Sequence, residues 1–236
     1  MTIESFAASL SVTEAILSRR SVRGFVGTEV PRSTIEALLE LAGRAPSGSN
    51  IQPWKVYVCS GPRKDSLTRS LLDAHFAGGA GHAEEYRYYP ESWREPYLAR
   101  RRRVGAGLYG LLGIAKGDQE AMSRQHARNY QFFGAPVGLF VTVPRDFPVG
   151  GWLDTGMFIQ TLLIAARGLG LDTCAQQSFA KFHSIVRGHL DIPGEETLVC
   201  GISLGHADSD APANALRTER VPISGFAKFV DGEARE

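Results

Sequence analysis

The segment from Gly151 to Arg167 is the strongest restriction on how this chain can fold. Its letters, WLDTGMFIQTLLIAAR after the first glycine, predict a long helix whose side chains are apolar on nearly every face. A helix that is apolar all round must be covered on all sides. It therefore lies either in a large core or in a contact between two subunits, and this favours a homodimer.

Elsewhere, apolar periodicity and turn-forming residues predict a chain of mixed helices and strands without an internal repeat. We expect helices near 11–20, 31–44 and 62–75, a helical region at about 93–132 broken around 113–118, and a short amphipathic helix at 178–190. Pro31 is expected as the first residue of its helix. Strands are expected near 55–60, 137–143, 171–175 and 197–204.

The composition is that of a globular protein with a substantial core. The 236 residues are 43% hydrophobic and 22% charged, which is enough to fold as one domain, residues 1–236, without disulfides. The net charge is +1 and the pI is about 7.8. Such a near-neutral chain has no overall field that favours nucleic acid or an anionic membrane, so the expected partners are small molecules and a second copy of itself.

The cysteines and the N-terminus both indicate a cytoplasmic protein. Cys59, Cys174 and Cys200 are odd in number, lack metal-binding or redox spacing, and lie in apolar, strand-like contexts. We interpret them as reduced thiols of the core. The first ten residues lack the charged start and apolar centre of a signal peptide, and no apolar span of 18 residues is expected elsewhere.

An arginine-rich segment, RRSVRGF from Arg19 to Phe25, follows the first predicted helix. Ser11 and Glu14 have the spacing of a capping box that begins this helix, so the arginines fall where the helix ends and the chain becomes extended. Guanidinium groups and a hydroxyl are suited to phosphate oxygens. Taken alone, the cluster is a weak signal, because arginines at a helix C-terminus more often simply complement the helix dipole.

A polar turn, APSGSNIQPW from Ala45 to Trp54, follows the second predicted helix. Pro46 and Pro53 restrict its backbone, the residues between them are small or form hydrogen bonds, and Trp54 can anchor it before the next strand. An ordinary helix-to-strand loop would have a similar composition.

The order and spacing of these two segments resemble the FMN-dependent nitroreductase family. The resemblance continues through FFGAPVGLFVTV (132–143), GLGLDTCAQQSF (168–179) and NALRTERVPISGF (214–226), and so covers most of the chain. It implies an α+β fold with a mixed central β-sheet flanked by helices. It also implies an intertwined homodimer, with FMN in clefts between the subunits and the C-terminal segment wrapped around the partner.

The resemblance also implies roles for individual residues. Arg19, Ser21, Arg217 and Arg220, assisted by Arg20, would hold the FMN phosphate and ribityl chain. Arg23 would lie near the pyrimidine edge and stabilise the negative charge of the reduced flavin.

Further positions would contact the flavin ring. The turn residues would reach the flavin bound mainly by the other subunit; they are Pro46, Ser47, Gly48 and Asn50. Gln131 matches a contact position, although its side-chain type departs from the usual one. Gln176, Gln177 and Ser178 would act mainly through main-chain N–H groups, because this loop lacks the Pro and Glu-Gly of familiar members.

No motif indicates that the protein's own side chains carry the chemistry. The sequence holds no credible catalytic triad, no HExxH motif, no Walker loop and no metal-binding cluster among its six histidines. The family implies a ping-pong cycle in which NAD(P)H reduces FMN and a nitroaromatic or quinone-like acceptor is then reduced by two-electron steps. Two alternatives stay open: another flavin reaction on this fold, dehalogenase-like or flavin-fragmenting, and a non-catalytic flavin-binding redox module.

The segment at about 76–117 is longer than compact members of the family require. It combines Tyr86, Tyr88, Tyr89, Trp93 and Tyr97 with a run of four arginines, 100–103. It could be a lid that lines the substrate cleft, part of a dimer surface, or a site for nucleic-acid phosphates. The near-neutral net charge argues against the last, and we favour a lid or dimer surface.

Overall fold

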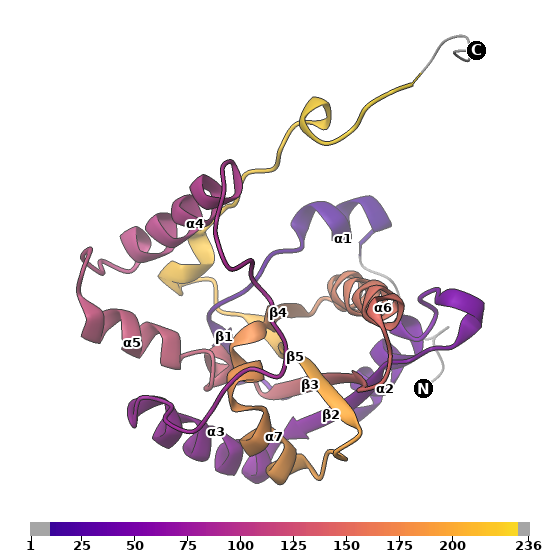
Figure 1. Ribbon diagram of the computed structural model, residues 1–236, viewed down its shortest axis with the longest axis horizontal. Coiled ribbons are helices and arrows are strands. Elements are labelled where there is room, and N and C mark those ends of the chain that lie inside the picture. The colour runs from indigo at the N-terminus through magenta and orange to yellow at the C-terminus, as the bar shows by residue number, and fades with distance from the viewer. Residues whose placement is uncertain (1–9, 231–236) are drawn as a thin grey trace.

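The computed structural model describes residues 10–230, which form helices around an antiparallel sheet (Figure 1). The α-helices are α1 (Val12–Ser18), α2 (Arg32–Ala42), α3 (Gly61–Phe76), α4 (Tyr97–Leu111), α5 (Gln119–Ala127), α6 (Val149–Gly168) and α7 (His183–Leu190). The strands are β1 (Phe25–Val26), β2 (Lys55–Ser60), β3 (Val137–Pro144), β4 (Asp172–Gln176) and β5 (Glu196–Ala207). Short 3-10 helices η2 (Gly48–Asn50), η3 (Phe132–Gly134), η4 (Gln177–Phe182), η5 (Pro212–Ala215) and η6 (Ile223–Gly225) connect them.

Strand β5 is the centre of the sheet. It pairs with β1, β3 and β4, and β2 pairs with the far side of β3; all four pairings are antiparallel. Parallel pairing within the described residues is limited to the isolated bridge between Ser21 and Thr173. The expected α+β fold is confirmed, and the mixed character of the sheet within this chain rests on that single bridge.

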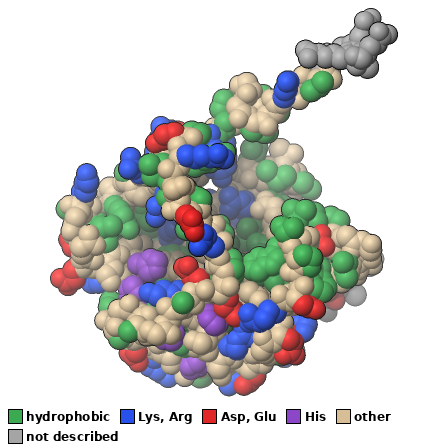
Figure 2. Space-filling view, viewed as in Figure 1, with side chains coloured by type: hydrophobic (Ala, Val, Ile, Leu, Met, Phe, Trp, Pro, Cys, Tyr) green, Lys and Arg blue, Asp and Glu red, His purple; other side chains and the backbone are tan. Residues whose placement is uncertain are grey.

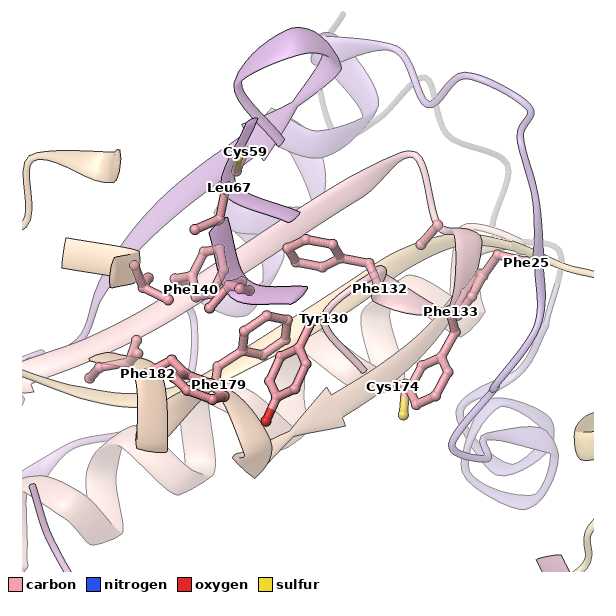
Figure 3. Close-up of a cluster of buried hydrophobic side chains, with 14 of the residues drawn as sticks. Phe25, Cys59, Leu67, Tyr130, Phe132, Phe133, Phe140, Cys174, Phe179 and Phe182 are labelled. Atoms are coloured by element: carbon pink, nitrogen blue, oxygen red, sulfur yellow. The ribbon is translucent and has the colours of Figure 1, made fainter. Parts of the chain in front are cut away.

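Alternation along the strands builds a core on each face of the sheet, because successive side chains point to opposite faces. On β3, Leu139 and Val141 join a buried cluster with residues of α2 and α6, including Leu38 and Leu162. Phe140 points the other way, into a cluster with residues of α3 and α7. Figure 3 shows the aromatic centre of this second cluster, where Tyr130, Phe132, Phe140, Phe179 and Phe182 pack together.

Most element boundaries agree with the sequence within a few residues, and the differences have local causes. The break in the 93–132 region is real, because α4 ends at Leu111 and α5 begins at Gln119. Pro31 caps α2 instead of starting it, since its ψ of 142° is extended. The 178–190 helix opens as the tighter η4 turn before α7. The two-residue strand β1 is too short to show a periodic pattern.

Helix α6 departs from the expectation that the chain has no apolar span of 18 residues. By length and composition it could cross a membrane, with a mean hydropathy of 1.2. Its inner face is nevertheless that of a core helix, with Phe158, Leu162 and Ala166 buried. Only 39% of the apolar window is buried within this chain, so much of α6 is not covered by its own fold.

The three cysteines are confirmed as buried free thiols. Burial raises the pKa of Cys59 and of Cys174 to about 11, and that of Cys200 to about 12. These groups are therefore protonated and unreactive at neutral pH.

Candidate active site

A cavity of about 890 Å³ opens between the end of α1, the segment that follows it, α6 and the C-terminal segment. Its charged lining is strongly asymmetric, with six arginines and one carboxylate: Arg19, Arg20, Arg23, Arg167, Arg217, Arg220 and Asp172. Ser18, Ser21, Gln160 and Thr218 add polar groups, and Ile16, Leu17 and Leu216 add apolar ones. The fold thus brings together two arginine segments that are almost 200 residues apart.

Among the described residues, only one of the six cavity arginines, Arg167, has a carboxylate partner. The one carboxylate is already engaged, because Asp172 Oδ1 lies 3.0 Å from Arg167 Nη1 and Asp172 Oδ2 accepts a hydrogen bond from the Ala207 N–H. Burial and the nearby Arg220 lower the pKa of Arg19. Burial and the nearby Arg217 lower the pKa of Arg20. Mutual repulsion of this kind is relieved by a bound anion.

Helix α1 delivers the first arginines to the cavity. Its capping box forms as expected, with Ser11 Oγ accepting from the Glu14 N–H and Glu14 Oε2 accepting from the Ser11 N–H. The helix ends at Ser18, and the chain turns extended at Arg19, which has a ψ of 128°. The Val22 N–H then donates to the Thr173 carbonyl at 3.0 Å, so this segment lies along the start of β4.

Asn214 ties the two arginine segments to each other. Its side chain is 4% exposed; Oδ1 accepts from the Arg23 N–H at 2.7 Å, and Nδ2 donates to the carbonyls of Gly24 and Asp208, each at 2.8 Å. The carbonyl of Asn214 accepts from Arg217 Nη1 at 2.7 Å. Gly24 is required beside it, because a Cβ there would lie 2.3 Å from Ala211 Cβ.

The polar turn after α2 lies away from this cavity, against α6. The Gly48 N–H donates to Asp154 Oδ2 at 3.2 Å, and Ser47 Oγ accepts from the Gln52 N–H at 3.0 Å. Ser49, Asn50 and Gln52 all have positive φ, a strained arrangement that is characteristic of functional sites. Trp54 anchors the turn as expected, stacked on Phe158 with ring centroids 4.9 Å apart.

The loop that begins η4 has its glutamine side chains committed inside the protein. Gln176 is 2% exposed, donates to the Asn129 carbonyl at 2.8 Å and accepts from the Ser203 hydroxyl. Gln177 Nε2 donates to the Tyr86 hydroxyl at 2.5 Å. Ser178 Oγ is buried without a hydrogen-bond partner in the part of the chain that the structure describes. Any contact that Gln176 makes with a ligand is therefore left to its main chain.

The predicted site residues fall into separate groups in the structure. Those that line the cavity are Arg19, Arg20, Ser21, Arg23, Arg217 and Arg220. Those that do not line it are Pro46, Ser47, Gly48 and Asn50 in the polar turn, Gln131 at the start of η3, and Gln176, Gln177 and Ser178 at the start of η4. The cavity therefore brings together the residues predicted to bind the phosphate, with Arg23 beside them.

The site also contains residues that were not predicted, and three of them stand out. Arg167 and Gln160 reach the cavity from α6, and Asn214 positions its walls. A polar Gln160 in an apolar helix was the available sequence signal, since a buried apolar helix has little reason to carry it. Asn214 has no comparable signal, because its role depends on contacts with residues far away in the sequence.

The segment between α3 and α4 is fastened over the body of the protein at two neighbouring residues. Glu85, 9% exposed at its side chain, accepts from Arg145 Nη2 at 2.5 Å and from Arg187 Nη2 at 3.3 Å. Tyr86 donates to the Val199 carbonyl and packs on Trp152 at 4.4 Å between ring centroids. Because Tyr86 also binds Gln177, the segment is joined directly to the η4 loop.

Comparison with known proteins identifies the relatives of this chain. Residues 16–206 match the nitroreductase family. The chain is 46% identical to a 4-nitrobenzoate reductase of Nocardioides sp. strain LMS-CY, over 91% of this chain and 88% of that protein. It is 39% identical to a 4-nitrobenzoate reductase of Pseudomonas putida, over 91% and 93%.

A solved structure gives the same result for the fold. The FMN- and NADPH-dependent nitroreductase NfnB from sphigopyxis sp. strain HMH superimposes with a TM-score of 0.90 at 36% identity, covering 94% of this chain and all of that one. Fold, arginine segments and sequence identity agree over most of the chain. This protein belongs to the nitroreductase family.

Proposed function

We propose that this protein is an FMN-dependent oxidoreductase that uses NAD(P)H to reduce nitroaromatic compounds. The observation that carries the proposal is the cavity with six arginines, of which only Arg167 has a carboxylate partner among the described residues. The identity to two 4-nitrobenzoate reductases supports the nitroaromatic substrate class.

The cavity residues fit the phosphate end of FMN. A phosphate monoester carries nearly two negative charges and several acceptor oxygens, which suit guanidinium forks and the Ser21 hydroxyl. Arg19, Arg20, Arg217 and Arg220 would hold it, because they supply the charges that repel one another in the cavity. Bound FMN supplies two-electron redox chemistry between a nicotinamide and a nitro group.

The other predicted residues would position the flavin and the substrate and shield them from water. The backbone N–H of Arg23 donates to Asn214 Oδ1 beside the arginine cluster, and the Arg23 side chain would stabilise negative charge on the flavin ring. The main chain of Gln176, Gln177 and Ser178, together with Gln131, would contact the ring. The segment fastened by Glu85 and Tyr86 would cover the substrate and exclude water.

The protein is proposed to act as a cytoplasmic homodimer of one FMN-binding domain. Exposed apolar side chains on α1 and α6 support this, including Leu17 at 80% and Leu153 at 67%. The C-terminal segment leaves the body of the subunit (Figure 1) and exposes Ile223, Phe226 and Phe229. It would wrap the partner, while Pro46, Ser47, Gly48 and Asn50 reach the partner's flavin.

Anaerobic stopped-flow spectroscopy tests the proposed function. Purified protein loaded with FMN is mixed with NADH or NADPH, and bleaching of the flavin is followed by a second mixing with 4-nitrobenzoate. The expected result is rapid bleaching and then recovery of the oxidised spectrum. A flavin that no nicotinamide bleaches would refute the proposal and leave a non-catalytic flavin-binding module.

A further inference from the structure

The residues before α4 and the first turns of that helix form a surface of alternating rings and guanidinium groups. We call it the arginine–aromatic surface; it consists of Tyr89, Trp93, Arg94, Tyr97, Arg100 and Arg101. The Cζ atom of Arg101 lies 4.8 Å from the centroid of the Trp93 ring and 5.7 Å from that of Tyr89. Arg94 and Arg100 approach the Tyr97 ring at 5.8 and 5.6 Å.

This surface faces solvent, and three of its arginines have no carboxylate partner among the described residues. Tyr89 is 51% exposed and Tyr97 49%. Within residues 10–230, neither Arg94 nor Arg100 nor Arg101 forms an ion pair, whereas neighbouring arginines do: Arg87 pairs with Glu91, and Arg103 with Glu219. Three guanidinium groups are thus held in place by rings, which leaves their N–H edges able to donate to a ligand.

The surface is connected to the candidate flavin cavity through α4. The Arg103–Glu219 ion pair joins α4 to the C-terminal segment. A Cβ at Gly107 would lie 3.1 Å from Cδ1 of Leu216, which lines the cavity. Thr218 and Arg220, on either side of Glu219, line the cavity as well. Figure 2 shows basic side chains gathered over this part of the molecule. The surface and the arginine cavity are therefore joined through α4 and the C-terminal segment.

We propose that the arginine–aromatic surface binds the 2′-phosphoadenosine end of NADPH and so selects NADPH over NADH. The inference rests on the proposed use of a nicotinamide donor. A planar adenine matches the exposed rings, and a 2′-phosphate with nearly two negative charges matches several unpaired guanidinium groups. The nicotinamide is at the opposite end of the same molecule, so the two ends can bind at separate places on the protein.

The carboxylate of a nitrobenzoate is the other aromatic anion that this surface could bind. It carries a single charge and is separated from the nitro group by only one benzene ring. It therefore offers one negative charge to several unpaired guanidinium groups, whereas a 2′-phosphate offers nearly two. The adenine end of NADPH is therefore the better match.

Binding of a redox-inactive fragment tests the site without any turnover. The FMN-loaded protein is titrated by calorimetry with adenosine 2′,5′-bisphosphate and, separately, with 5′-AMP, which lacks the 2′-phosphate. The bisphosphate is expected to bind at least about tenfold more tightly, the usual effect of charge-assisted hydrogen bonds. Equal affinity for the two nucleotides would overturn the proposal.

Variants locate the binding. Arg100→Ala and Arg101→Ala should each remove most of the preference for the bisphosphate. Arg102→Ala is the matched control, because it removes the same charge from the same helix at a residue without a ring contact, and it should retain the preference. A preference that survives in Arg101→Ala, or is lost equally in Arg102→Ala, would contradict a site built on the rings.

Steady-state kinetics give the corresponding functional result. In Arg101→Ala the KM for NADPH should rise by about tenfold while the KM for NADH changes by less than about twofold. An equal change for both donors would overturn the assignment. A second outcome would also overturn it. In that outcome the KM values of Arg101→Ala for both donors are unchanged, and the variant reduces a nitrobenzoate less well than uncharged nitrobenzene. If neither donor supports turnover, the proposed function fails while the fragment titration still decides this site.

Discussion

Asn214 is the residue on which the arrangement of the arginine cavity depends most. Its amide joins the backbone at Arg23 and Gly24 to that at Asp208, and its own carbonyl holds Arg217. Asn214→Ala is expected to weaken FMN binding by at least about tenfold, because it leaves buried polar groups without partners. Fluorescence titration of the apoprotein with FMN measures the effect.

Asn214→Asp distinguishes the acceptor role of the side-chain amide from its donor role. The aspartate keeps an acceptor for the Arg23 N–H and loses the two donors. We expect an FMN affinity between those of wild type and Asn214→Ala. Wild-type affinity in both variants would show that Asn214 does not position the cavity.

Glu196 provides a test of stability against pH. The side chain is 1% exposed and accepts from Lys55 at 2.6 Å, Tyr57 at 2.9 Å and Thr142 at 2.5 Å. Burial alone would raise the pKa of Glu196, but these hydrogen bonds outweigh it and hold the pKa below its ordinary value of 4.5.

Because the folded pKa is lowered, the stabilisation is present above about pH 4.5 and is lost as the pH falls through the folded pKa. Glu196→Gln should lower the free energy of unfolding at pH 7 by about 2 kcal/mol. The difference from wild type should shrink towards pH 3 in urea unfolding. The exposed Glu36→Gln, which removes a surface pair with Arg32, should have little effect at either pH. A pH-independent difference would contradict the role of the charge.

At this scale the sequence predicted charged residues better than the residues that position them. Arg19, Arg217 and Arg220 were expected to act together, and all three line the cavity, as does Arg23, which was expected at the pyrimidine edge. The residue type alone shows that a guanidinium group is suited to bind an anion. The contribution of Gln160 or Asn214 depends on contacts with residues that are distant in the sequence, and a single sequence does not reveal such contacts.

Among the elements, the segment between α3 and α4 has the most specific attachment. Burial tends to raise the pKa of Glu85, but Arg145, His183 and the Leu198 N–H outweigh it and lower the pKa. Glu85→Gln is expected to loosen the segment, because it removes the charge that faces Arg145 and Arg187. Limited proteolysis within 87–95 should become faster, while FMN affinity stays unchanged.

Glu91→Gln is the control within the same segment. Its exposed pair with Arg87 should contribute little, so its cleavage rate should match that of wild type. Equal protection in Glu85→Gln and wild type would mean that the segment is held by Tyr86 alone. A parallel loss of FMN would instead place Glu85 in the cofactor site.

Elements with strong local periodicity were predictable, and those set by tertiary contacts were not. Strand β2 forms over the predicted residues 55–60, and α6 follows the apolar run. Strand β1 exists only because Phe25 and Val26 meet Ala207 and His206 of β5.

For the whole molecule, the exposed apolar face of α6 predicts a subunit contact. Leu153→Arg places a charge on that face and is expected to shift the protein from dimer to monomer. Sedimentation velocity at several concentrations measures the change. Leu153→Met, which conserves volume and apolarity, is the control. An unaltered dimer in the arginine variant would exclude this face of α6 from the interface.

The central claim is that the arginine cavity holds the FMN phosphate, and riboflavin tests it because it differs from FMN only in lacking that phosphate. The account predicts that wild-type protein binds FMN at least about 100-fold more tightly than riboflavin. In Arg19→Ala/Arg220→Ala this ratio should fall by at least about tenfold, with riboflavin affinity nearly unchanged. Arg32→Ala, at an exposed surface pair, should keep the wild-type ratio. Equal binding of the two flavins, or a ratio unaffected by the double substitution, would contradict it.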